Sequence, residues 1–190
     1  MKRSGVIFIL SIVSFVLFLL NISHHQSHVS FRHTKSVRIR QTAQVSYTAV
    51  PIGYNRVTRV IDGDTIEVEI NGNVEKVRLI GVDTPETVDP RKIVQCFGKE
   101  ASEMSKKILT EKNVKLESDS TQTNRDKYNR LLRYVYIEDG TLVNKYLIEK
   151  GFGHEYTYHV PYMYQIEFKQ AEKYARENSL GLWAPGVCAQ

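Results

Sequence analysis

Short apolar runs in the middle of the chain predict β-strands. Runs that are rich in β-branched residues, alternate with polar positions and are bounded by turn residues are typical of strands. Five such runs occur, at residues 56–61, 65–70, 74–82, 114–117 and 131–137. The second and third are joined by Asn71-Gly72-Asn73, a sequence that favours a tight hairpin turn. We therefore expect these two strands to pair in antiparallel fashion.

Three other segments have apolar residues at helical spacing. They lie at residues 99–112, 142–150 and 162–178, and each predicts an α-helix. Gly151 is placed to end the second helix, and Pro161 to introduce the third. Five strands with interposed and trailing helices indicate an α+β fold.

The first 54 residues have a different pattern. Lys2 and Arg3 precede a mostly apolar, uncharged run at residues 4–23, which predicts an export signal or a membrane anchor. The run is longer than the usual core of a cleavable signal, and no small-residue cleavage site follows it. We favour an uncleaved hydrophobic helix at residues 1–23, with a cleaved signal as the alternative. Residues 24–54 are polar and predict a flexible, basic, His-containing linker to a globular domain at residues 55–190.

Net charge does not identify a binding surface on that domain. The chain of 190 residues has a formal charge of +5, which would ordinarily suggest an affinity for nucleic acid. However, six of its 26 Lys and Arg and none of its 21 Asp and Glu lie in the first 55 residues, so residues 56–190 have a formal charge of −1. Any binding of nucleic acid by the domain must therefore rely on local cations or on help from the linker.

Acidic residues at two predicted turns form a candidate metal site. Asp64, in a DGDT turn, and Asp83, in a DTPE corner, are separated by a strand-sized apolar run, so a hairpin could bring both carboxylates together. Oxygen ligands without Cys or His suit calcium or magnesium. Pro85 stiffens the second corner, where Glu86 could act as a general base for an attacking water.

Arg78 lies among apolar residues of the third predicted strand. An Arg in such a position usually has an anionic partner, either internal or bound. A straight strand would separate Arg78 from Asp83 by about 16 Å. If both serve one phosphate, the strand must bend strongly or bulge, and we expect this near Gly81.

Each of these features also has a purely structural interpretation. DGD is an ordinary turn sequence and DTPE an ordinary surface corner, while an Arg within a strand is more often part of a structural ion pair. Arg130, which precedes the fifth predicted strand, could simply belong to a polar turn. The order and spacing of all these residues together favour the functional interpretation.

In this combination the sequence resembles the thermonucleases, the secreted staphylococcal-type nucleases. The matching segments are VIDGDT at 60–65, VRLIGVDTPET at 77–87, FGKEAS at 97–102, DKYNRLLRYVY at 126–136, LVNKYLIEKG at 142–151 and GLW at 181–183. They follow the family's order from about residue 56 to 186. The resemblance implies an OB-fold, a five-stranded β-barrel with three helices, here preceded by the N-terminal hydrophobic helix.

The same resemblance implies a function. It implies a calcium-dependent nuclease that cleaves DNA and RNA, favours single strands, leaves 3′-phosphate ends and is a monomer. It assigns metal binding to Asp64, Asp83 and the carbonyl of Thr84, the role of general base to Glu86, and phosphate binding to Arg78 and Arg130. The alternative is a nucleic-acid-binding module of the same fold without catalytic activity.

The resemblance also concerns the nucleotide-binding surface and the location of the protein. Lys127 and Tyr128 are similar to family positions that line the nucleotide, and Tyr156 or Tyr158 could stack on a base. The alternatives are an exposed Lys, a strand-end Tyr and tyrosines that fill the core. Because the family is predominantly secreted, we expect export, either as a membrane-anchored protein with an extracellular domain or as a secreted one.

The chain has only two cysteines, Cys96 and Cys188. In an exported protein an even pair favours a disulfide, and two separate thiols are the alternative. The pair can bond only if the Cα atoms come within about 7 Å of each other.

Overall fold

The computed structural model describes residues 50–87 and 93–188. The predicted hydrophobic helix at residues 1–23 and most of the predicted linker lie outside the described residues. Within the described part of the chain, no helix has both the length and the apolar character needed to span a bilayer.

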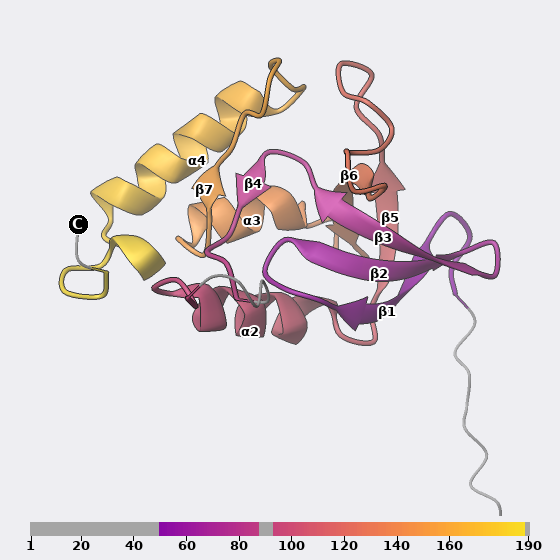
Figure 1. The fold of residues 1–190 in the computed structure, drawn as a ribbon, viewed down its shortest axis with the longest axis horizontal. Helices are drawn as coiled ribbons and strands as arrows, with labels where there is room; N and C mark the ends of the chain where they lie inside the picture. The colour runs from indigo at the N-terminus through magenta and orange to yellow at the C-terminus, as the bar shows by residue number, and fades with distance from the viewer. Residues whose placement is uncertain (1–49, 88–92, 189–190) are drawn as a thin grey trace, which may run out of the picture. The chain divides into compact units, whose positions relative to one another are not determined.

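Five strands form a closed barrel in the order β1-β2-β3-β6-β5 (Figure 1). Their bounds are Asn55–Val60 for β1, Thr65–Ile70 for β2, Asn73–Leu79 for β3, Asn113–Glu117 for β5 and Leu131–Ile137 for β6. β2 and β3 form the expected antiparallel hairpin, and the pairing of β3 with β6 is parallel. The five predicted strands are therefore confirmed, with one change at the end of the third.

That change is a break in the strand at Gly81. β3 ends at Leu79, and a separate short strand, β4 at Val82–Asp83, begins after a turn in which Gly81 has a φ of +75°. β4 pairs with β7, His154–Glu155, in a second sheet outside the barrel. The expected bend near Gly81 is present, while β7, two residues long, was not predicted.

Within residues 50–87 and 93–188, three α-helices complete the fold and confirm the predicted α+β architecture. They are α2 at Gly98–Leu109, α3 at Val143–Glu149 and α4 at Gln165–Glu177, and a short 3-10 helix, η2, follows at Gly181–Trp183. α2 contacts β1, whereas α3 and α4 pack against each other (Figure 1). α2 ends before the predicted residue 112 because Thr110 is extended and Glu111 has a positive φ.

The core is built from the inward positions of the strands and one face of each helix. Alternation along β2 and β3 buries Ile66 and Val68 of one strand and Val77 and Leu79 of the other. The helices contribute further apolar side chains, among them Leu109, Leu147 and Phe168. This packing supports the strand ends at which the polar residues of the candidate site lie.

Candidate active site

The DGDT turn places Asp64 at the start of β2. The Asp62 carboxylate accepts a hydrogen bond from the backbone N–H of Asp64 at 3.0 Å, and Gly63 packs tightly against Thr84. A Cβ on Gly63 would come within 2.5 Å of the Thr84 hydroxyl, so only glycine fits there. The turn therefore brings β2 directly against the residues that follow β4.

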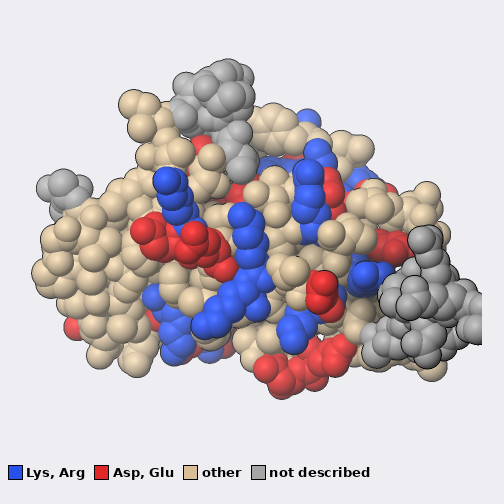
Figure 2. Space-filling model, turned by 90° about the horizontal axis from the view of Figure 1, so that it is seen from below, with Lys and Arg blue, Asp and Glu red and all other residues tan. Residues whose placement is uncertain are grey.

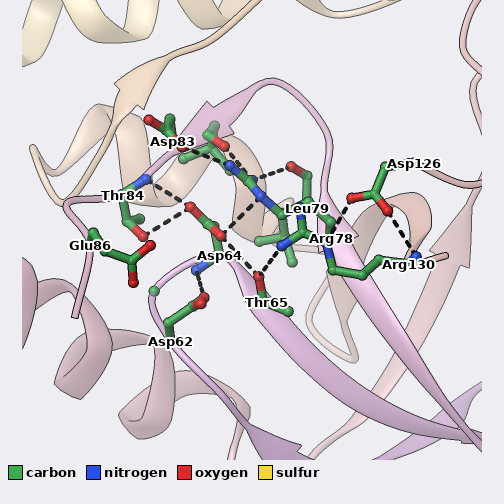
Figure 3. Close-up of polar contacts among 12 residues, drawn as sticks. Asp62, Asp64, Thr65, Arg78, Leu79, Asp83, Thr84, Glu86, Asp126 and Arg130 are labelled. Atoms are coloured by element: carbon green, nitrogen blue, oxygen red, sulfur yellow. Dashed lines mark hydrogen bonds and ion pairs between the residues drawn. The ribbon is translucent and has the colours of Figure 1, made fainter. Parts of the chain in front are cut away.

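Asp64 is buried, with 6% of its surface exposed. Its Oδ1 pairs with Arg78 Nε at 3.1 Å and accepts a hydrogen bond from the Thr65 hydroxyl. Its Oδ2 accepts hydrogen bonds from the Thr84 backbone N–H at 2.8 Å and from the Thr84 hydroxyl at 3.0 Å. Asp64 thus joins the beginning of β2, the end of β3 and the residue after β4 (Figure 3).

Arg78 bridges the two carboxylates that the sequence placed at separate turns. Its Nη2 lies 2.8 Å from Asp83 Oδ1, while Nη1 donates to the carbonyls of Leu79 and Val82. The bend at Gly81 makes this contact possible. The anionic partners expected for Arg78 are therefore internal in this structure, and its side chain is 13% exposed.

Arg130 reaches the site from the loop before β6. Its Nε pairs with Asp126 Oδ2 at 2.7 Å, and its Nη1 donates to the Thr65 hydroxyl at 3.3 Å. Thr65 in turn donates to Asp64, so both arginines connect to the same carboxylate. Sequence reasoning gave Asp126 no role, because residues 126–130 form a turn and the i,i+4 ion-pair rule applies to helices.

Glu86 lies at the opposite end of the constellation from Arg130 (Figure 3). Its Oε1 accepts a hydrogen bond from the Thr87 backbone N–H at 2.9 Å. Its own backbone N–H donates to Gln95 Oε1 at 2.7 Å. Gln95 was also missed by the sequence analysis, because a hydrogen bond from a loop side chain to the backbone leaves no periodic signal.

Negative charge is concentrated at this site. Burial, and then the charge of Asp64, raise the pKa of Asp62 to about 6. Burial also raises the pKa of Asp83, an effect that Arg78 partly offsets and the Asp64 charge reinforces. The carboxylates therefore favour a bound proton or cation.

The acidic groups do not form a preassembled cage. Among the described residues, no three His, Cys, Asp or Glu side chains are close enough together to hold a metal ion. Asp64 and Asp83 could hold one only with oxygen donors of another kind, such as a backbone carbonyl and water. A hard cation such as calcium fits donors of this chemistry.

Four further residues form an exposed, partly aromatic surface, which we call the aromatic surface: Lys127, Tyr128, Tyr156 and Tyr158. Lys127 Nζ lies 5.1 Å from the Tyr128 ring centroid, and the rings of Tyr156 and Tyr158 are 6.2 Å apart. The side chains of Tyr128 and Tyr158 are 68% and 58% exposed. Among the tyrosines of this stretch, it is Tyr162 that fills the core.

Cys96 and Cys188 form a disulfide. Their Cα atoms are 5.8 Å apart, and the bond spans a sequence separation of 92. It connects the segment before α2 with the C-terminal segment after η2. A cleft of about 340 Å³ lies beside it, lined by Pro85, Gln95, Cys96, His154, Leu182, Trp183 and Cys188.

Comparison with known proteins identifies relatives. A family model described as staphylococcal nuclease homologue matches residues 76–185. The chain is 46% identical to a thermonuclease of Staphylococcus intermedius over 127 residues, which cover 67% of this chain and 74% of the relative. It is 42% identical to a thermonuclease of Staphylococcus hyicus over 129 residues, 68% of this chain and 75% of the relative. It is also 40% identical to the endonuclease YncB of Bacillus subtilis over 127 residues, 66% of this chain and 59% of the relative.

Proposed function

We propose, from the premise that this chain belongs to the family of staphylococcal nuclease homologues, that it is a calcium-dependent nuclease. It hydrolyses phosphodiester bonds of DNA and RNA and leaves 3′-phosphate ends. One observation carries the proposal: Arg78 pairs with both Asp64 and Asp83, and Arg130 connects to the same buried Asp64 through the Thr65 hydroxyl. Positive groups fixed next to acidic oxygens suit the binding of both a cation and a phosphate.

The metal-binding part of the proposal rests on the donor chemistry. Asp64, Asp83 and the Thr84 carbonyl would hold Ca²⁺, with water completing its coordination. The raised pKa of Asp83 supports this, because a bound cation stabilises carboxylates that burial and mutual repulsion disfavour. When bound, calcium supplies positive charge that stabilises negative charge on phosphoryl oxygens.

The two arginines supply the phosphate contacts. Attack on a phosphodiester increases the negative charge on the phosphoryl oxygens, so fixed cations stabilise the transition state more than the ground state. A guanidinium stays protonated at any working pH and presents a planar fork to two oxygens. Asp126 orients Arg130, and the carbonyls of Leu79 and Val82 orient Arg78.

Glu86 is the proposed general base. The hydrogen bond from the Thr87 N–H holds one carboxylate oxygen in place, and a carboxylate is a residue type that can accept a proton from water. The rigid Pro85 fixes the chain just before it.

The aromatic surface is the proposed contact for the bases. Exposed tyrosine rings can stack on bases of a single strand, and Lys127 adds a local cation. Figure 2 shows basic and acidic side chains side by side on one face of the molecule. This agrees with the near-neutral charge of residues 56–190 and with binding that depends on local groups. We further propose a monomer that is exported, either anchored through residues 1–23 or secreted.

The test is degradation of denatured DNA by the full-length protein in mild detergent. We expect degradation with calcium and none with a calcium chelator, with 3′-phosphate ends on the products. Glu86→Gln should lower kcat by about 10² to 10⁴-fold, the usual range for loss of a general base, and leave DNA binding intact. Glu103→Gln, at an exposed position on α2, is the matched control and should be fully active.

Two results would contradict the proposal. Undiminished activity of Glu86→Gln would remove the general base from the mechanism. Calcium-independent DNA binding without any degradation would instead indicate a non-catalytic binding module of the same fold.

A further inference from the structure

Both backbone polar groups of Glu86 are occupied by a single residue, Gln95. The Glu86 N–H donates to the Gln95 side-chain oxygen at 2.7 Å, and the Gln95 N–H donates to the Glu86 carbonyl at 3.0 Å. Pro85, the preceding residue, has no N–H with which to add a third backbone contact. Gln95 therefore holds the backbone of Glu86 on both sides of its Cα, beside the start of α2, where a Cβ on Gly98 would lie 3.2 Å from the Glu86 carbonyl oxygen.

One hydrogen bond of the Glu86 carboxylate is linked to the same contact. Thr87 donates its backbone N–H to Glu86 Oε1 at 2.9 Å, so the peptide between these two residues helps to orient the carboxylate. The Glu86 carbonyl is part of the peptide group between Glu86 and Thr87. The Gln95 N–H donates to this carbonyl and so helps to fix the peptide group. A shift of Gln95 would thus move the Glu86 carboxylate through the backbone, without direct contact between the side-chain amide of Gln95 and the carboxylate.

Gln95 lies in an exposed segment of the chain. All four residues of the segment 93–96 are exposed, and Ile93 exposes 91% of its surface. A cleft of about 340 Å³ separates this part of the chain from Trp183. Among the residues that the structure describes, side-chain packing therefore contributes little to the position of Gln95.

A covalent bond next to Gln95, rather than side-chain packing, holds this segment in place. Cys96, the residue after Gln95, is bonded to Cys188, and the Gln95 carbonyl accepts a hydrogen bond from the Gly98 N–H at 3.1 Å where α2 begins. Phe97 contacts Phe152 with a ring-centroid distance of 5.6 Å, which holds the start of α2. The disulfide is thus attached directly next to the residue that places Glu86.

We propose that Gln95 is a positioning residue for Glu86 and that the Cys96–Cys188 disulfide keeps Gln95 in place, so that full activity requires the oxidised protein. The statement about activity rests on the proposed nuclease function, whereas the statement about position does not. A dithiol reductant such as dithiothreitol would break the S–S bond and supply two electrons and two protons. The products are two cysteine thiols and the cyclic disulfide of the reductant.

The first test uses Gln95→Met, which keeps the length of the side chain and removes its acceptor oxygen. We expect kcat to fall about 10-fold or more with little change in KM, because a misplaced catalytic group slows the reaction strongly. Gln170→Met, at an exposed position on α4, is the matched control and should keep the wild-type kcat. An unchanged kcat in an active Gln95→Met protein would overturn the role of Gln95 in catalysis.

The second test does not depend on activity. Hydrogen exchange of the Glu86 amide, followed by NMR, reports its hydrogen bond to Gln95. Exchange should become at least about 10-fold faster in Gln95→Met and in Cys96→Ser/Cys188→Ser, and stay unchanged in Gln170→Met. Unchanged exchange in Gln95→Met would overturn the positional proposal, whether or not the protein is a nuclease.

The third test asks whether the disulfide acts through Gln95. Cys96→Ser/Cys188→Ser and the triple variant with Gln95→Met are assayed at a temperature at which circular dichroism shows both to be folded. If the disulfide acts through Gln95, kcat of the triple variant should be no lower than that of the less active of Gln95→Met and Cys96→Ser/Cys188→Ser. If the two effects are independent, the losses of kcat should add as free energies. Additive losses would overturn the link. An inactive oxidised wild type would contradict the proposed function, and the exchange rates would still decide the positional proposal.

Discussion

Single carboxylates in this molecule hold several segments together, and Asp119 is the clearest case outside the candidate site. This buried residue accepts hydrogen bonds from the Tyr134 hydroxyl at 2.6 Å, the Met163 N–H at 2.7 Å and the Thr121 N–H at 2.8 Å. It thereby connects the loop after β5 with β6 and with the segment before α4.

Asp119 should make stability depend on pH. Burial alone would raise its pKa, but the hydrogen bonds from Met163, Tyr134 and Thr121 outweigh burial and hold the pKa below its ordinary value. Its contribution is therefore fully present above the unfolded-state value of about 3.9 and is lost as the pH falls through the lower folded-state pKa. We expect Asp119→Asn to lower the free energy of unfolding by about 2 kcal/mol or more at pH 7.

The measurement is urea denaturation of wild type and Asp119→Asn at pH 7 and at about pH 3. The difference between the two proteins should shrink at the lower pH. An equal difference at both pH values would show that the charge of Asp119 contributes nothing.

At the scale of residues, the sequence identified side chains that the structure brings together, but it did not identify their individual contacts. Arg78 lies among apolar strand residues, where a guanidinium needs an anionic partner. The sequence therefore predicted that Arg78 would contact an acidic group. Which carboxylates it would contact depended on the bend at Gly81. Gln95 and Asp126 were overlooked because their roles consist of local hydrogen bonds to Glu86 and Arg130.

Among the structural elements, the turn between β3 and β4 has the largest effect on the site. It places Asp83 next to Arg78, and it is tightly packed. A Cβ on Gly81 would lie 2.6 Å from Tyr162 Cε2 and 2.8 Å from Phe168 Cδ2, and the φ of this residue is +75°. Both the backbone conformation and the lack of space therefore require glycine.

Gly81→Ala should destabilise the protein and disturb the candidate site. We expect the free energy of unfolding to fall by more than the roughly 1 kcal/mol that backbone strain alone costs, because overpacking adds about 1 to 3 kcal/mol. Gly140→Ala is the matched control. Gly140 also has a positive φ, +87°, but a Cβ added there would have no atom within 4 Å. Equal losses in the two variants, measured by urea denaturation, would show that the contacts with Tyr162 and Phe168 relax without cost.

Elements were predictable where their pattern is local. Alternation of apolar and polar residues identified the five barrel strands to within a few residues. β7 is too short to leave a pattern, and the parallel pairing of β3 with β6 cannot be deduced from either strand alone. The periodicity of the sequence therefore predicted only an α+β fold. The closed barrel was predicted from the resemblance to a known family.

For the molecule as a whole, the disulfide is the covalent connection between distant parts of the chain. It joins residues that are 92 positions apart. In the chain-entropy account, closing a loop of that length stabilises the folded state by about 4 to 5 kcal/mol, less any strain.

Reduction should therefore lower the stability of the whole domain. We expect the free energy of unfolding of Cys96→Ser/Cys188→Ser to be lower than that of the oxidised wild type by up to about 4 to 5 kcal/mol. Dithiothreitol should lower the midpoint of the wild type and leave that of the variant unchanged. Equal midpoints of oxidised wild type and variant would show that the unfolded chain is not restricted by this bond.

The parallel pairing of β3 with β6 also affects the order of events during folding. The β2–β3 hairpin is local and can form early, and with it come Asp64 and Arg78. Arg130 reaches Thr65 only after β6 has joined β3, and contacts so distant in sequence form late because loop-closure entropy opposes them. A nascent or partly folded chain consequently lacks one of the two cations proposed to bind phosphate. The proposed nuclease activity, which needs both arginines, should therefore arise only after β6 has joined β3.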